Sequence, residues 1–435
     1  MCRRILLPAV LLSLLALTLA AQPHTAGWSF TGSASATSPT PVALGLVDST
    51  GKLSTILTVS QLPANVYAAG GTIDYDDRIY VMALLSKVIN GSVIQVDQKG
   101  SIVQTIQVES TNPGMGGGMT YDVILDQNGD YIVVVGFGGG TPFPGLRKVD
   151  RANKVTTIYQ GAPLRDPYAV TVDINSGDFV VVDTSTHGVY RIAPDGSAIT
   201  SVGIFPSNLS IRNQICQDPR TGDYFVGSFQ SNGAVLMRMD QLGQMTTFLA
   251  SGLIAGYGVY PDRASAAAPR LAVGSTSTTS GIFFVDLATK AITTLINTAS
   301  SSLTYLQVFP ARELATYLRS PGCWEIYLHF AGEAGNAYAV GLSLSDVRPG
   351  VPLPDGRRIL LNVDDLTALS LSGRLGPLFA GNVGKLTPSA RAMAVLDVSS
   401  LPVLKGLPIW LLAATLNPQA PLGIQTISDP LRITL

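Results

Sequence analysis

One short turn recurs six times along this chain and constrains its fold more than any other feature. Each copy follows a short apolar strand and precedes another. Asp starts such a turn by bonding its own backbone, and Gly or Asn supplies the positive φ that closes a hairpin. The repeat therefore predicts six β-hairpins. The copies are Val47-Asp48-Ser49-Thr50-Gly51-Lys52, Val96-Asp97-Gln98-Lys99-Gly100-Ser101, Val149-Asp150-Arg151-Ala152-Asn153-Lys154, Ile192-Ala193-Pro194-Asp195-Gly196-Ser197, Met239-Asp240-Gln241-Leu242-Gly243-Gln244 and Val285-Asp286-Leu287-Ala288-Thr289-Lys290.

A second turn interleaves with the first, at residues 126–130, 173–178 and 218–223, with looser copies starting at Asp76, Asp262 and Pro310. The two turns together give four strands per unit, and the unit repeats every 43 to 53 residues. Four antiparallel strands at that period indicate a blade of a β-propeller. Separate hairpins could carry similar turns, but they would leave the apolar strands uncovered.

The count of units predicts a six-bladed propeller over residues 40–318. Five complete blades begin near Gly71, Gly118, Pro167, Arg212 and Gly256. We expect the sixth blade to be split between the two ends of the propeller, which leaves no free sheet edge. Residues 303–309 and 313–318 would supply its two inner strands, and residues 43–47 and 53–59 its two outer strands.

Residues 321–435 lose both turns and are expected to form a second domain. About eight strand candidates in about 115 residues predict a β-sandwich, and no helix of consequence is expected. The predicted fold class is therefore all-β. The candidate strands are residues 324–330, 338–344, 358–361, 368–371, 390–398, 409–416, 424–427 and 431–435.

The first 21 residues are typical of a signal peptide. Arg3 and Arg4 precede an apolar stretch at residues 5–19, and small residues offer cleavage near Gln22. An uncleaved membrane anchor is the alternative, but the stretch is short for a membrane span. No later segment is long enough to span a membrane. We therefore expect a secreted, periplasmic or cell-surface protein.

Charge and cysteine usage limit the function classes. The net charge is −1 and no basic run follows the first residues, which excludes nucleic acid as an expected partner. Cys216 and Cys323 are expected in an inner strand and at the domain junction. Export permits a disulfide, but these places favour two buried thiols.

The stretches 166–173, 177–183 and 188–192 together resemble an NHL repeat. This class is also similar to the propellers of the gluconolactonase group and of virginiamycin B lyase, and the resemblance covers residues 40–318. It implies a propeller but not one function, because these propellers include enzymes and binding modules. The C-terminal part resembles a β-sandwich module found at the ends of many secreted bacterial proteins, through residues 338–345, 350–356 and 427–435.

Aligning the predicted inner strands places two rows of side chains at one mouth of the axial channel. Tyrosines there could form a collar for a small polar ligand, a glycan or a protein. The alternative is that they pack between blades. His187 lies in a loop expected on the same face. The candidates are Tyr121, Tyr168, Asn213, Tyr257 and Tyr305 in one row, and Asp122 and Gln214 in the next.

Three functions stay open at this point. The first is a binding or scaffold propeller. The second is a lactonase-type hydrolase or lyase, because the gluconolactonase resemblance implies a divalent cation such as calcium, and Asp122 and Asn213 match its ligands in type. No Glu stands at an equivalent position, and a lyase needs a pair of acid–base groups where only His187 is available. The third is a structural cell-surface protein.

Overall fold

The structure is a computed structural model that describes residues 28–34, 42–48, 51–63, 66–74, 79–85, 91–109, 118–136, 144–209, 214–230, 233–250, 256–262, 268–275, 280–298, 303–310, 313–345, 348 and 350–435. Strands dominate this part of the chain, and its only α-helix has seven residues, so the predicted all-β class is confirmed. The predicted signal peptide lies outside the described residues.

Six four-stranded antiparallel sheets hold the described strands between residues 28 and 310. The first contains β4 (Tyr67–Ile73), β5 (Ile79–Leu85), β6 (Ser92–Asp97) and β7 (Ile102–Gln107). The second contains β8 (Met119–Leu125), β9 (Tyr131–Gly136), β10 (Gly145–Val149) and β11 (Val155–Gln160). The third contains β12 (Pro167–Val172), β13 (Phe179–Asp183), β14 (Gly188–Ile192) and β15 (Ile199–Ile204).

The fourth sheet contains β16 (Ile215–Gln217), β17 (Tyr224–Gln230), β18 (Gly233–Met239) and β19 (Met245–Leu249). The fifth contains β20 (Gly256–Asp262), β21 (Arg270–Ser275), β22 (Ser280–Asp286) and β23 (Ile292–Thr298). The sixth contains β24 (Leu303–Pro310), β1 (Trp28–Ala34), β2 (Val42–Val47) and β3 (Leu53–Thr58), after which the 3-10 turn η1 (Val59–Gln61) leads toward the first sheet.

The sheets follow one another in a closed ring of contacts. The inner strands β4, β8, β12, β16, β20 and β24 contact one another in that order, and β24 contacts β4. Neighbouring sheets also share hydrophobic cores; one unites Val81 and Val93 of the first sheet with Val123 and Val133 of the second. Such cores cover both faces of each sheet. The predicted propeller architecture is confirmed, and we interpret the six sheets as its blades.

The sixth sheet joins distant parts of the chain, but not as predicted. The predicted outer strands are β2 and β3, and β24 is the inner strand. The assignment of residues 313–318 to this blade is wrong, because β25 (Leu314–Ser320) pairs with β26 (Cys323–His329) instead. Its place is taken by β1, in which Trp28 stands opposite Pro310. The alternation of Trp28-Ser29-Phe30-Thr31 is a strand signal that counting turns overlooked.

The hairpin turns repeated in the sequence also fit neighbouring blades together. Gly196, in the turn after β14, has a φ of +74°, and a Cβ there would overlap the backbone carbonyl oxygen of Ile158 in β11 of the preceding blade. Gly100 and Gly243 stand in the same relation to the outer strands β3 and β15. Glycine alone combines a positive φ with such a close approach. These glycines are therefore needed both to form the hairpin turns and to pack neighbouring blades together.

The C-terminal part forms two sheets. One has the order β25, β26, β32 (Arg391–Asp397) and β30 (Phe379–Ala380). The other has the order β31 (Val383–Lys385), β27 (Ala337–Ser343), β33 (Pro408–Leu416) and β34 (Ile424–Ile427), with β35 (Leu431–Thr434) also paired to β33. The remaining elements are the hairpin of β28 (Val351–Pro352) and β29 (Arg358–Ile359), the helix α1 (Asp365–Leu371), and the 3-10 turns η2 (Gly376–Leu378), η3 (Pro402–Leu404) and η4 (Pro421–Gly423).

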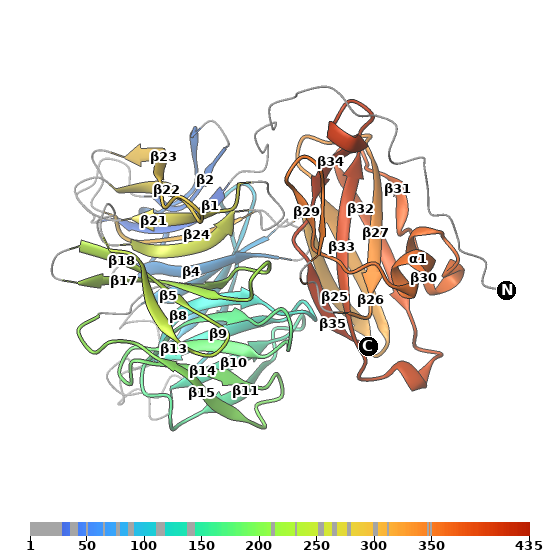
Figure 1. Cartoon of the computed structure of the whole chain (residues 1–435). Helices are drawn as coiled ribbons and strands as arrows, with labels where there is room; N and C mark the ends of the chain where they lie inside the picture. The colour runs from blue at the N-terminus through green and yellow to red at the C-terminus, as the bar shows by residue number, and fades with distance from the viewer. Residues whose placement is uncertain are drawn as a thin grey trace.

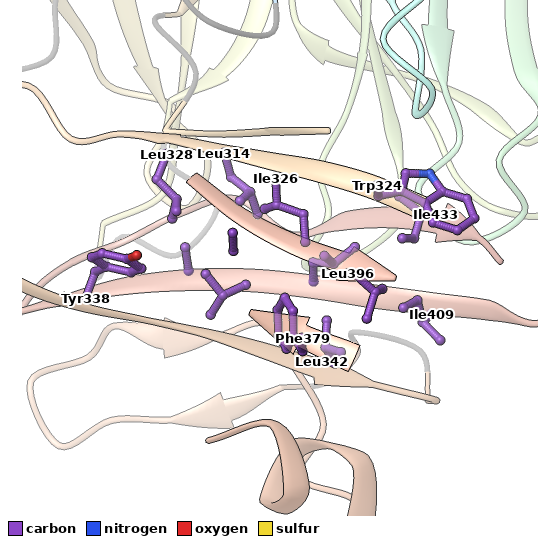
Figure 2. Packing of buried hydrophobic residues seen from close by; sticks show 14 of the residues in the cluster. Leu314, Trp324, Ile326, Leu328, Tyr338, Leu342, Phe379, Leu396, Ile409 and Ile433 are labelled. Carbon is purple, nitrogen blue, oxygen red and sulfur yellow. The ribbon is translucent and has the colours of Figure 1, made fainter. Parts of the chain in front are cut away.

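One hydrophobic core lies between these two sheets. Figure 2 shows Leu314, Ile326 and Leu328 from one sheet lying across from Leu342 and Ile409 of the other. All five side chains are at most 4% exposed. Two sheets whose inner faces interdigitate in this way are arranged as in a β-sandwich. We interpret the C-terminal part as such a domain.

The predicted strand at residues 368–371 is wrong, because α1 occupies this segment. Asp364 caps the helix: its side chain accepts a hydrogen bond from the backbone N–H of Thr367 at 2.9 Å. A capping aspartate satisfies an N–H group that the first helical turn leaves unpaired. The run Ala-Leu-Ser-Leu is too short for its periodicity to separate helix from strand, so the cap decides.

Two further expectations concern the cysteines and the membrane. Cys216 and Cys323 are both free and buried, so the prediction of two buried thiols is confirmed. In the described part of the chain, no helix has the length and apolar composition needed to span a membrane.

Candidate functional site

Two tyrosines of the predicted collar pack against each other. The rings of Tyr121 in β8 and Tyr168 in β12 stack with their centroids 4.1 Å apart, and both side chains are less than a tenth exposed. The Tyr121 ring also covers Gly136 in β9, where a Cβ would overlap it. This geometry favours packing between blades, the alternative that the sequence left open. Three other candidates lie outside the described residues, wholly or in their side chains: Asn213, Tyr257 and Tyr305.

Asp122 links the second and third blades. Its side chain is fully buried, and Oδ2 accepts a hydrogen bond from the backbone N–H of Val170 in β12 at 3.1 Å. Oδ1 accepts from the N–H of Val123 at 2.9 Å. Burial raises the pKa of Asp122 to about 7, against the opposing effect of these two N–H donors. The cation site suggested for Asp122 and Asn213 stays a prediction, because Asn213 is not described.

The raised pKa of Asp122 predicts a pH-dependent stability. The folded protein holds this proton up to about pH 7, whereas the unfolded chain releases it near pH 4, so its contribution to folding is lost as the pH rises between these values. The shift corresponds to roughly 4 kcal/mol. Asp122→Asn keeps the shape of the protonated carboxyl. It should therefore reduce the fall in the free energy of unfolding as the pH rises from about 4 to about 7. Urea unfolding at pH 4.5, 5.5, 6.5 and 7.5 measures the effect as the difference from the unsubstituted chain.

Asp97→Asn is the control for this pH series. Asp97 is exposed, and N–H groups of Ser101 and Lys99 lower its pKa, so its substitution should produce a small slope of opposite sign. A difference between Asp122→Asn and the unsubstituted chain that stays constant from pH 4.5 to 7.5 would contradict the prediction.

His187 occupies a turn between β13 and β14 with a φ of +53°. Asp183 organises this turn by accepting hydrogen bonds from the N–H and the hydroxyl of Thr186 at 2.9 and 3.0 Å. Nδ1 of His187 is buried and has no hydrogen-bond partner among the described residues. Among the described residues, no contact joins His187 to another predicted site residue.

The alignment of the first blade needs a correction. β4 ends at Ile73, so the aspartate that follows the inner strand is Asp74, the counterpart of Asp126 in the second blade. The sequence alignment used Asp76, which lies outside the described residues. In the first blade, the two predicted rows of side chains at the channel mouth therefore lie two residues earlier in the sequence.

The C-terminal domain covers the end of the propeller at which the inner strands finish, as Figure 1 shows by the orange and red strands beside the propeller. Nε1 of Trp410 in β33 donates to the carbonyl oxygen of Ile174, in the turn after β12, at 3.0 Å. The hydroxyl of Thr316 in β25 donates to the carbonyl oxygen of Gln127, in the turn after β8, at 2.7 Å. Arg348 binds the turn after β16 in the same way. Three successive blades thus hold this domain.

A cavity of about 180 Å³ lies at this junction. The inner strands β8, β12, β16 and β20 line it, together with residues of β25 and β35 from the C-terminal domain. Most of the cavity therefore lies toward the end of the inner strands opposite the predicted ligand face, and it extends as far as Gln214, the residue before β16. Its apolar walls include Ile124, Val172, Ile215, Leu314, Pro430 and Leu431.

Gln214 is the predicted site residue that lines this cavity. Its side chain is 5% exposed, and its Oε1 is buried without a hydrogen-bond partner in the part of the chain that the structure describes. Gln217, on the same wall, is satisfied, since its Oε1 accepts from the N–H of Ile174 at 2.8 Å and its Nε2 donates to Gly222 at 3.2 Å. An unpaired buried carbonyl oxygen costs roughly 1–3 kcal/mol.

Asp126 is the cavity residue that sequence reasoning missed. Its counterparts in four other blades are each paired with an arginine, whereas Asp126 has no ion pair with a described residue. Lys148 holds the strand position that Arg191 holds in the third blade, but it reaches Asp130 at 3.3 Å. Arg238, at the same position in the fourth blade, likewise pairs with Asp223 and not with Asp218. The four pairs are Asp74–Arg151, Asp173–Arg191, Asp218–Arg220 and Asp262–Arg270.

The environment of Asp126 is unusual for a carboxylate. The side chain is 9% exposed, and burial together with the charge of Asp130 raises its pKa to about 7. Oδ1 accepts from the N–H groups of Asn128 and Asp130 at 2.7 and 2.9 Å, which leaves no such donor on Oδ2. In the described ranges, no three His, Cys, Asp or Glu side chains gather as a metal-binding group.

Comparison with known proteins assigns no family. No family model and no curated protein matches the sequence. Among solved structures, the chain is similar to a protein of unknown function from Bacteroides caccae, at 10% identity over 65% of this chain and 99% of that one, with a TM-score of 0.49. A nidogen/laminin complex gives 11% identity, coverages of 65% and 98%, and a TM-score of 0.47. A gluconolactonase from Xanthomonas campestris gives 14% identity, coverages of 58% and 84%, and a TM-score of 0.41. At these identities and TM-scores, the matches assign no activity to the chain.

Proposed function

We propose that this chain is an exported binding protein that holds a small molecule between its propeller and its C-terminal domain. The observation that carries the proposal is the cavity of about 180 Å³ between the propeller and the C-terminal domain. Small-molecule sites occur preferentially at domain interfaces, in apolar pockets with a few polar groups. Gln214 and Asp126 are polar residues of this wall. The signal peptide expected at residues 1–21 supports export.

The volume of the cavity limits the size of the ligand that it can hold. An engineered apolar cavity of about 150 Å³ binds benzene, so a cavity of about 180 Å³ suits a molecule of roughly six to eight non-hydrogen atoms. A glycan chain or a protein surface, which the sequence left open as ligands, is much larger. The proposal is therefore a small-molecule site at the covered end of the inner strands.

Filling the cavity tests this function. Thr171 in β12 lines the cavity, and Thr171→Phe adds a ring to it. We expect a library of compounds of up to eight non-hydrogen atoms, screened by ligand-observed NMR, to contain molecules that bind the unsubstituted chain and lose at least about tenfold in affinity with Thr171→Phe.

Thr156→Phe is the matched control, because Thr156 is exposed on the outer strand β11. Thr156→Phe should leave the affinity of every binding compound unchanged. Melting temperatures establish that both variants are folded. The function is wrong if no compound in the library distinguishes Thr171→Phe from Thr156→Phe.

A further inference from the structure

The polar groups of this cavity point to a class of ligand. We propose that the cavity binds a small organic ammonium ion, whose N–H groups donate to the carboxylate of Asp126. The inference rests on the proposed function and deepens it by naming the ligand class.

The repeated blades provide an internal comparison for Asp126. In four other blades, the aspartate after the inner strand is compensated by an arginine, as Asp173 is by Arg191 at 2.9 Å. Burying a carboxylate without a cation is costly, because the lost hydration is not replaced. Asp126 is buried like these counterparts, but no described residue forms an ion pair with it, and the charge of Lys148 lowers its pKa only against larger opposing effects. The cavity beside it offers the space in which a ligand can supply the missing positive charge.

The turn that contains Asp126 uses only part of its carboxylate. Oδ1 accepts the two backbone N–H groups that close the turn, as the corresponding oxygen of Asp97 does in an exposed turn. Oδ2 therefore remains as an acceptor without affecting the turn. Lys148 does not occupy it, because its ammonium group pairs with Asp130 at 3.3 Å.

The wall around Asp126 has both apolar and charged side chains. Ile124, Val172 and Ile215 line the cavity, as do Glu313, Asp429 and Arg432. A primary ammonium group donates up to three hydrogen bonds to carboxylate or carbonyl oxygens, and an alkyl chain fits the apolar part of the wall. A neutral alcohol brings a donor without the positive charge, and an anion is repelled by the carboxylate of Asp126.

Arg432 is the cation of the cavity wall, but its charge belongs to the domain junction. Its guanidinium donates to the side chains of Gln127 and Thr434 at 3.5 and 3.1 Å. The charges of Asp178 and Asp173 raise its pKa, and burial lowers it more. The charge of Arg432 thus acts on carboxylates of the third blade, and its Nε is buried without a hydrogen-bond partner among the described residues.

Three probes with one carbon skeleton test the ligand class: n-pentylammonium, 1-pentanol and pentanoate. They are titrated at pH 8, where Asp126 is ionised, and binding is measured by ligand-observed NMR. We expect n-pentylammonium to bind the unsubstituted chain more tightly than the other two. Asp126→Asn should weaken its binding at least about tenfold, while 1-pentanol changes less than about threefold.

Lys148→Arg is the sharpest variant, because it removes no group from the cavity. The longer side chain can pair with Asp126 as Arg191 pairs with Asp173, and it should compete with n-pentylammonium and weaken its binding about tenfold. Asp97→Asn, in an exposed turn of the same geometry, should have no effect. Melting temperatures verify that each variant is folded.

The outcomes separate the ligand class from the function. Binding of 1-pentanol that equals n-pentylammonium and is lost in Thr171→Phe would overturn the ammonium proposal and leave the binding function in place. Unchanged binding of n-pentylammonium in both Asp126→Asn and Lys148→Arg would overturn it as well. If none of the three probes binds and the library also yields no cavity-dependent compound, both proposals fail.

Discussion

Gly196→Ala is expected to lower the free energy of unfolding by about 3 kcal/mol or more. Two costs combine at this position. The first is the positive φ of +74°, which costs a residue with a Cβ roughly 1–2 kcal/mol. The second is the overlap of the new Cβ with the carbonyl oxygen of Ile158, which belongs to the backbone of the preceding blade and cannot rotate away. Overpacking of this kind costs roughly another 1–3 kcal/mol. Equilibrium unfolding in urea measures the sum.

Gly373→Ala separates the two costs. Gly373 has a φ of +69°, but a Cβ there would meet nothing within 4 Å, so only the backbone strain applies. We expect Gly100→Ala and Gly243→Ala to resemble Gly196→Ala, because both glycines also lie against the outer strand of the preceding blade. Equal losses at Gly196 and Gly373 would show that the turn packs loosely between blades.

Asp173→Ala should be similarly damaging, with an expected loss of roughly 3–5 kcal/mol. Asp173 is 3% exposed, and its Oδ2 accepts hydrogen bonds from Arg191 at 2.9 Å and from the hydroxyl of Tyr224. Burial and the charge of Asp173 raise the pKa of Tyr224, so this hydroxyl stays protonated and acts as a donor. The substitution leaves a buried hydroxyl without its acceptor and leaves Arg191 with the more distant carboxylate of Asp178, at 4.0 Å. It also removes the turn bonds to Asn175 and Ser176.

Asp195→Ala is the matched control, because Asp195 is exposed and its Oδ1 accepts from the N–H of Ser197 in a hairpin turn at 2.9 Å. We expect it to cost no more than about 1 kcal/mol. Tyr224→Phe, alone and combined with Asp173→Ala, isolates the bond between the third and fourth blades as a double-mutant cycle. A loss for Asp173→Ala no larger than that for Asp195→Ala would contradict the importance assigned to this network.

Turn chemistry made most of the propeller predictable from the sequence. Asp97 bonds the N–H groups of Lys99 and Ser101, as the repeated motif implies, and five sheets follow from such turns. The strand β1 was missed because no copy of either turn flanks it. The segment at residues 368–371 was misassigned because its short apolar pattern suits two periods, and the cap at Asp364 decided for the helix.

The candidate site could be predicted only in part. Aligned strands identified Gln214, because position along an inner strand follows from the repeat. The cavity itself depends on contacts between residues far apart in sequence, such as Gln127 with Thr316 and Arg432. No local pattern encodes such contacts. Asp126 stands out only by comparison with the other blades, because their equivalent aspartates are paired with arginines.

The short connection between β24 and β25 limits how far the C-terminal domain can move relative to the propeller. Only three residues separate Pro310, the last of β24, from Leu314, the first of β25. A connection of this length reaches at most about 14 Å. The C-terminal domain beside the cavity is thus tethered to β24, the strand that closes the ring by pairing with β1. This domain can therefore move only a short way from the cavity before it pulls on that pairing.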